Sequence, residues 1–136
     1  MNTHETYVSL EVAKLLKEAG FDWYVEQWYE VLKNGQEMYA EGMTYNMNCG
    51  LYGESVYSMP TLSIAQRWLR EIENIDVYIF PTTNTKRECV YQVGIKTFGR
   101  EMWIPGQPSD AKYYTYEEAQ EEGIKKALEL ILEKDE

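Results

Sequence analysis

Residues 88–97 read Glu-Cys-Val-Tyr-Gln-Val-Gly-Ile-Lys-Thr, a run with the two-residue alternation that is typical of a half-buried strand. We expect the buried face of this strand to consist of alternate residues: Cys89, Tyr91, Val93 and Ile95. An antiparallel sheet with a single apolar face is stable when helices cover that face. This stretch therefore predicts a sheet with helices packed on one side.

Three amphipathic segments can supply that cover, and each has an apolar stripe on one face: residues 10–19, 61–73 and 116–133. Ser9 is placed to cap the start of the first helix, and Gly20 is placed to end it in the left-handed conformation. Thr115 and Glu118 have the spacing of a capping box at the start of the third helix. Trp68 and Ile72 lie in the stripe of the second helix, so we expect both in the core.

A β-hairpin is predicted around Asn34-Gly35, which lies between the apolar runs 28–32 and 37–40. Asn-Gly favours a type I′ turn, because that turn needs positive φ at both central residues. A helix through residues 24–32 is the alternative interpretation of the first run.

Weaker patterns complete the chain. Strands are expected near 56–57, over 76–80 up to Pro81, and over 101–104. The stretches 41–58 and 105–110 are predicted to be irregular. The whole chain, residues 1–136, is then expected to form one α+β domain, an antiparallel sheet with three helices on one face. From residue 61 onward its order is α-β-β-(β)-α, which double-stranded-RNA-binding domains share as topology alone.

The charge of the chain argues against general nucleic-acid binding. The 136 residues carry a formal net charge of −10, and affinity for phosphate backbones comes from Lys and Arg. Basic residues outnumber acidic ones in just one part of the chain, residues 60–103. If an interaction surface lies there, it consists of the following residues: Arg67, Arg70, Lys86, Arg87, Lys96, Arg100 and Trp103. Trp103 either closes the core at a strand end or stacks on a ligand.

No constellation for catalysis or cofactor binding is recognisable. The single histidine, His4, lies near the N-terminus, and the two cysteines, Cys49 and Cys89, share no ligand spacing with it. Phosphate-binding glycine loops are absent, so no cofactor is expected. The paired carboxylates lie on outward helix faces, where they are expected to be solvated.

The cellular setting is expected to be the cytoplasm. The first residues lack the basic start and apolar run of a signal peptide, and no stretch is apolar enough to span a membrane. In a reducing compartment Cys49 and Cys89 are expected to remain unpaired.

Three stretches together, residues 7–22, 59–71 and 116–131, resemble a family of small uncharacterised proteins encoded by gut Bacteroides and their prophages. The resemblance implies a bacterial or prophage origin and no particular activity. The leading hypothesis is a non-enzymatic accessory module that binds a protein partner or a second copy of itself. The alternatives are a nucleic-acid-associated protein that uses residues 60–103, and an enzyme that acts through carboxylates.

Overall fold

The computed structural model describes residues 6–51, 53–97, 100–103 and 113–134, with residues 100–103 and 134 described by their backbone alone. The elements follow in this order: α1 (Leu10–Ala19), β1 (Val25–Val31), β2 (Glu37–Tyr45), β3 (Val56–Ser58), α2 (Leu62–Ile72), β4 (Ile75–Thr83), β5 (Cys89–Thr97), β6 (Arg100–Trp103) and α3 (Tyr116–Lys134). The α+β class is confirmed, and so is the order α-β-β-β-α of the C-terminal half.

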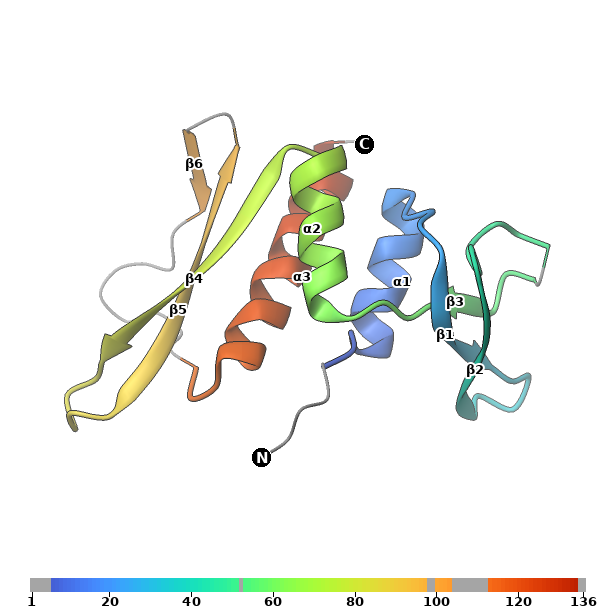
Figure 1. The fold of residues 1–136 in the computed structure, drawn as a ribbon, viewed down its shortest axis with the longest axis horizontal. Helices are drawn as coiled ribbons and strands as arrows, with labels where there is room; N and C mark the ends of the chain where they lie inside the picture. The colour runs from blue at the N-terminus through green and yellow to red at the C-terminus, as the bar shows by residue number, and fades with distance from the viewer. Residues whose placement is uncertain (1–5, 52, 98–99, 104–112, 135–136) are drawn as a thin grey trace.

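The strands form two antiparallel sheets, whereas we had expected one. The first sheet has the order β2-β1-β3 and the second has the order β4-β5-β6. The two sheets lie at opposite ends of the molecule, and the three helices lie between them (Figure 1). Each half of the chain contains a helix followed by three strands. In the first sheet the central strand is β1, the first of its three strands along the chain, whereas in the second sheet it is β5, the second of its three. The two halves are therefore not a topological repeat.

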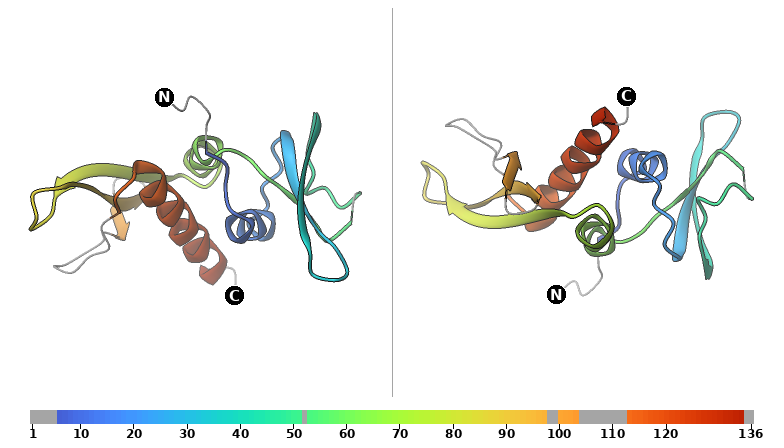
Figure 2. Two further views of the ribbon diagram at one scale, coloured as in Figure 1. Left: turned by 90° about the horizontal axis from the view of Figure 1, so that it is seen from below. Right: turned by 90° about the horizontal axis from the view of Figure 1, so that it is seen from above.

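The helices divide between the sheets according to their contacts. α3 packs on β4 and β5, and α2 packs on β4 and α3. α1 packs on α3 and β3, and the hydroxyl of Tyr29 in β1 donates a hydrogen bond to the carbonyl oxygen of Val8 just before α1, at 2.8 Å. The views from below and above show the same arrangement (Figure 2). The helices therefore cover one face of each sheet and also pack on one another.

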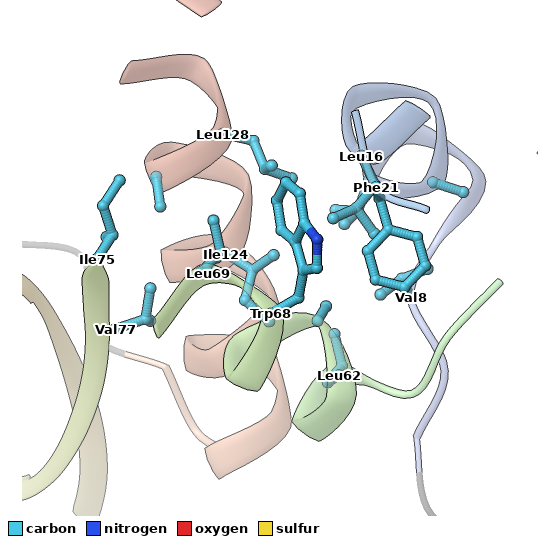
Figure 3. Packing of buried hydrophobic residues seen from close by; sticks show 14 of the residues in the cluster. Val8, Leu16, Phe21, Leu62, Trp68, Leu69, Ile75, Val77, Ile124 and Leu128 are labelled. Carbon is cyan, nitrogen blue, oxygen red and sulfur yellow. The ribbon is translucent and has the colours of Figure 1, made fainter. Parts of the chain in front are cut away.

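Trp68 of α2 lies at the centre of the core, as its place in the apolar stripe predicts. It is 1% exposed, and its ring meets Phe21 edge-on at a centroid distance of 5.5 Å. Leu128 of α3 and Leu16 of α1 flank the indole (Figure 3). One buried cluster thus joins residues from both ends of the chain. The indole N–H has no hydrogen-bond partner among the described residues, so packing is what holds this side chain.

The predicted hairpin is confirmed, but its turn is not type I′. β1 pairs with β2 in antiparallel register, and positive φ occurs at Gly35 (84°) and not at Asn34. The amide of Gly35 donates to the carbonyl of Leu32, and the amide of Leu32 donates to the carbonyl of Gln36. This is the three-residue loop that ends in a left-handed residue. A helix through 24–32 is excluded, because β1 occupies that range.

The same turn joins β4 to β5 without a glycine. The amide of Arg87 donates to the carbonyl of Asn84, the amide of Asn84 donates to the carbonyl of Glu88, and Arg87 has a φ of 64°. The side-chain oxygen of Asn84 also accepts from the amides of Lys86 and Glu88. These local hydrogen bonds compensate for the strain of a non-glycine residue in the left-handed region.

Two strands are longer than expected. β4 continues through Pro81, which pairs in register with Tyr91. β4 is an outer strand, and the Asn84–Glu88 pair at the turn is hydrogen-bonded. Because bonded and non-bonded pairs alternate along an antiparallel ladder, the nitrogen of Pro81 points away from β5, and the missing N–H of proline costs no hydrogen bond there.

β2 continues to Tyr45, so the irregular stretch is shorter than residues 41–58. The bare Cα of Gly42 makes room for the ring of Trp28, which lies against it.

The caps of α1 combine local and distant groups. The hydroxyl of Ser9 accepts from the amide of Val12, and Gly20 ends the helix at a φ of 95°, as predicted. The amide of Ser9 itself donates to a carboxylate oxygen of Glu121 in α3, at 2.7 Å. In a capping box a side chain of the same helix accepts a hydrogen bond from this amide. Here the acceptor is the carboxylate of Glu121 in α3, and this hydrogen bond holds α3 beside the start of α1.

At the start of α3 one half of the predicted capping box is present. The amide of Glu118 donates to the hydroxyl oxygen of Thr115 at 3.1 Å. The Glu118 carboxylate accepts from the Thr115 hydroxyl, at 3.2 Å, in place of the backbone amide that a full capping box uses. The predicted buried stripe is also present, with Ala119, Ile124 and Leu128 fully buried.

Candidate protein-interaction groove

The basic residues singled out in the sequence lie on three separate parts of the fold. Arg67 and Arg70 are exposed on α2, and Lys86 and Arg87 occupy the exposed β4–β5 turn. Lys96 is exposed on β5, with its ammonium 5.3 Å from the centre of the Tyr78 ring. β6 includes Arg100 and Trp103, and Trp103 pairs with Ile95, but the side chains of both lie outside the described part of the structure.

The structure does not bring these cations into one patch. Lys96 pairs with Asp76 near the start of β4, whereas Lys86 and Arg87 lie beyond Thr83 at its other end. At about 3.3 Å per residue, the strand separates the two groups by roughly 20 Å. The turn also points away from α2 (Figure 1). The nucleic-acid hypothesis needed one-sided clustering, and the described residues do not provide it.

We therefore expect no useful affinity for duplex DNA or RNA at about 150 mM salt, since binding scales with the number of phosphates that are neutralised together. Anisotropy titration of the full chain against a labelled duplex checks this. Micromolar binding that weakens steeply as salt increases would contradict the prediction.

A different surface feature has the shape of a binding site. A groove with a volume of about 850 Å³ runs between α2 and the chain that enters β1. Its apolar lining comes from three segments distant in sequence: Tyr7, Trp23, Tyr24, Met59, Ile64 and Ile72. Its charged lining is Asp22, Glu26, Arg67 and Glu71. We call this feature the α2–β1 groove.

The local sequence explains how the groove forms. Gly20 reverses the chain after α1, and the next residue, Phe21, is 1% exposed and fixed in the core against Trp68. With Phe21 fixed inward, the residues that follow are presented at the surface, so Trp23 is half-buried and Tyr24 is 64% exposed. Ile72 ends the stripe of α2 and is 53% exposed, in contrast to the core position that periodicity predicts.

The groove is acidic. Arg67 forms an ion pair with Glu71, with a distance of 3.1 Å between Nε and Oε1, and its guanidinium lies 5.9 Å from the centre of the Trp23 ring. Asp22 and Glu26 are exposed, and neither has an ion-pair partner within the described ranges. Within the part of the chain that the structure describes, two carboxylates of the groove thus have no counter-charge.

Outside the groove, Lys17 has a structural role. Its ammonium donates to the carbonyls of Gly53, Glu54 and Val56, at 3.4, 3.1 and 2.8 Å, and lies 4.9 Å from the centre of the Tyr57 ring. Desolvation lowers the pKa of Lys17, and the charge of Glu54 opposes this shift by raising the pKa. The contacts hold the irregular segment before β3 against α1.

The carboxylates of the groove, Asp22, Glu26 and Glu71, are all exposed. In the part of the chain that the structure describes, no cluster of His, Cys, Asp and Glu could hold a metal ion. None of the helices described has the length and apolar composition of a membrane span.

Cys49 and Cys89 are free thiols, and both are exposed. The inward orientation expected for Cys89 is wrong, because it begins β5 beside the turn.

Sequence reasoning missed the groove, although Arg67 was among the candidate residues. The available signal was Asp22-Trp23-Tyr24, a charged and aromatic run directly after a helix-ending glycine. A scan against protein-family models, a search of curated proteins and a search of solved structures each found no match to this chain.

Proposed function

We propose that this protein is a non-enzymatic interaction module of bacterial or prophage origin, and that it binds a segment of a partner protein in the α2–β1 groove. The observation that carries the proposal is the combination of an aromatic-walled groove of about 850 Å³ with two carboxylates, Asp22 and Glu26, that have no ion-pair partner among the described residues. Grooves with apolar walls and a few placed polar groups are the usual form of a recognition site.

The charges of the groove define the chemistry of its occupant. A peptide segment with a Lys or Arg side chain would pair with Asp22 and Glu26, while neighbouring apolar side chains would contact Ile64 and Ile72. The exposed Tyr24 ring offers a cation–π surface in addition. Arg67 already lies over Trp23 in this manner, so the geometry suits a guanidinium.

Isothermal titration of the full chain with short synthetic peptides tests the proposal. We expect micromolar affinity for peptides in which Lys or Arg alternates with Leu, and no measurable affinity for the matching peptides with Glu in place of the cations. The double substitution Asp22→Asn with Glu26→Gln should weaken binding about tenfold, since each exposed charge pair contributes about 0.5–1 kcal/mol.

A matched control removes the same number of charges elsewhere. Glu18→Gln with Asp76→Asn changes two exposed carboxylates, one on α1 and one on β4, neither of which lines the groove, so affinity should stay near that of the unmodified chain. Equal losses in the two double variants would indicate a general effect of net charge. That result, or equal affinity for basic and acidic peptides, would refute the proposal.

A further inference from the structure

We infer that β2 is a dimerisation edge, along which two copies of this chain pair antiparallel about a twofold axis at Ala40. β2 is an outer strand of the sheet β2-β1-β3, and no strand among the described residues pairs with its free edge. It is nine residues long, and nearly all of it is exposed. A long, open edge of this kind is a template for a further strand.

The composition of the edge protects it only in part. Native edge strands avoid association through charged side chains, above all Lys, and through Pro and β-bulges. Residues 37–45 contain neither Lys nor Pro, but they contain two exposed carboxylates, Glu37 and Glu41, and the register with β1 shifts between Glu41 and Tyr45. Beside these charges the strand exposes large apolar side chains, with Met38 50%, Tyr39 68% and Met43 91% exposed. Exposure of this kind is expected where another surface covers the strand.

The hydrogen-bond alternation shows which backbone groups are available. The amide of Leu32 donates to the carbonyl of Gln36, so the ladder starts with a hydrogen-bonded pair at the turn. In antiparallel pairs the bonded and non-bonded positions alternate. The backbone groups of Glu37, Tyr39 and Glu41 therefore point away from β1, toward the free edge.

Charge selects the register. A twofold axis at Tyr39 would set Glu37 opposite Glu41 twice, and an axis at Glu41 would set that carboxylate opposite itself. An axis at Ala40 sets Tyr39 opposite Glu41, where both have outward backbone groups and a hydroxyl donor meets a carboxylate acceptor. It also leaves no two carboxylates directly opposite each other.

The regular part of β2 is long enough for this pairing. β2 keeps its register with β1 from Glu37 to Glu41, and the register shifts between Glu41 and Tyr45. With the axis at Ala40, the paired residues Tyr39, Ala40 and Glu41 all lie in the regular part. The second copy thus fits the charge pattern of the edge, and pairing would join the β2-β1-β3 sheets of the two copies into one sheet of six strands.

Sedimentation of the full chain tests this inference, from about 1 μM to about 1 mM, the span of moderate to weak association. We expect a monomer–dimer equilibrium that shifts toward the dimer as salt increases, because each copy carries a net charge of −10 and salt screens their repulsion. A species that remains monomeric throughout, or a dimer that salt dissociates, overturns the proposal.

Two variants locate the contact. Tyr39→Glu places a carboxylate opposite Glu41 of the second copy and should raise the dissociation constant about tenfold, since the pair occurs twice. Tyr39 is 68% exposed, so the monomer fold should be unaffected. Tyr39→Pro removes an outward donor and should abolish the dimer. The control Ile72→Ala removes an exposed apolar side chain of the groove on α2 and should leave the dimer intact. An unchanged dissociation constant in Tyr39→Glu, or a dimer lost in Ile72→Ala, would refute the β2 contact.

Discussion

Replacing Trp68 with alanine should lower the free energy of unfolding by about 3–5 kcal/mol, the loss typical of a large aromatic side chain deleted from a core. The ring is 1% exposed and contacts residues of α1, α2 and α3 together. Its removal leaves a cavity bordered by side chains of all three helices, and little of the surroundings can collapse into it. Urea unfolding monitored by circular dichroism measures the change.

Trp68→Phe is the informative companion of that variant. The indole N–H is buried without a hydrogen-bond partner among the described residues, so phenylalanine removes a poorly satisfied donor along with part of the volume. We expect a loss of about 1 kcal/mol, well below that of alanine. Equal losses for the two substitutions would show that the indole nitrogen makes a stabilising contact.

Replacing Gly123 with alanine should destabilise the protein by about 1–3 kcal/mol, although alanine is the better helix former. Gly123 lies where α3 packs against β4 and β5 of the second sheet. A Cβ built there would come within 2.4 Å of a Val93 methyl carbon and within 2.6 Å of a Val77 methyl carbon. β-Branched side chains have few alternative rotamers, so the helix itself would have to move. Chemical denaturation of the purified variant measures the loss.

A second substitution separates this steric effect from a loss of helix stability. Val93→Ala removes the methyl groups nearest to the added Cβ, and by itself it should be destabilising as a cavity-forming change. Combined with Gly123→Ala, it should cost less than the sum of the two single variants, because one change makes room for the other. Strict additivity in this double-mutant cycle would contradict the close-packing explanation.

Local signals in the sequence predicted the elements of this fold well. Ser9 and Gly20 marked the ends of α1, and Thr115 with Glu118 marked the start of α3, because caps are satisfied by groups within a few residues. The Asn-Gly pair located the β1–β2 hairpin, although it did not identify the turn type. Periodicity also placed Trp68 in the core correctly.

The sequence was less informative about edges and ends. It placed a strand stop at Pro81, which an outer strand tolerates, and it placed Ile72 and Cys89 on buried faces. Alternation along one strand shows that a residue shares a face with its neighbours. It does not show whether a helix extends far enough to cover that residue, and Cys89 lies beyond that cover.

By itself, then, the sequence determined the class of the fold, the positions of the helices and strands, and the acidic character of the surface. These follow from hydrogen bonds and side-chain periodicity between residues close along the chain. The separation into two sheets, the carboxylate of Glu121 at the start of α1 and the α2–β1 groove were decided by the tertiary structure alone. Each depends on which of several comparable apolar faces and strand edges meet, and that choice is made by packing between segments up to 112 residues apart, for which no local pattern exists.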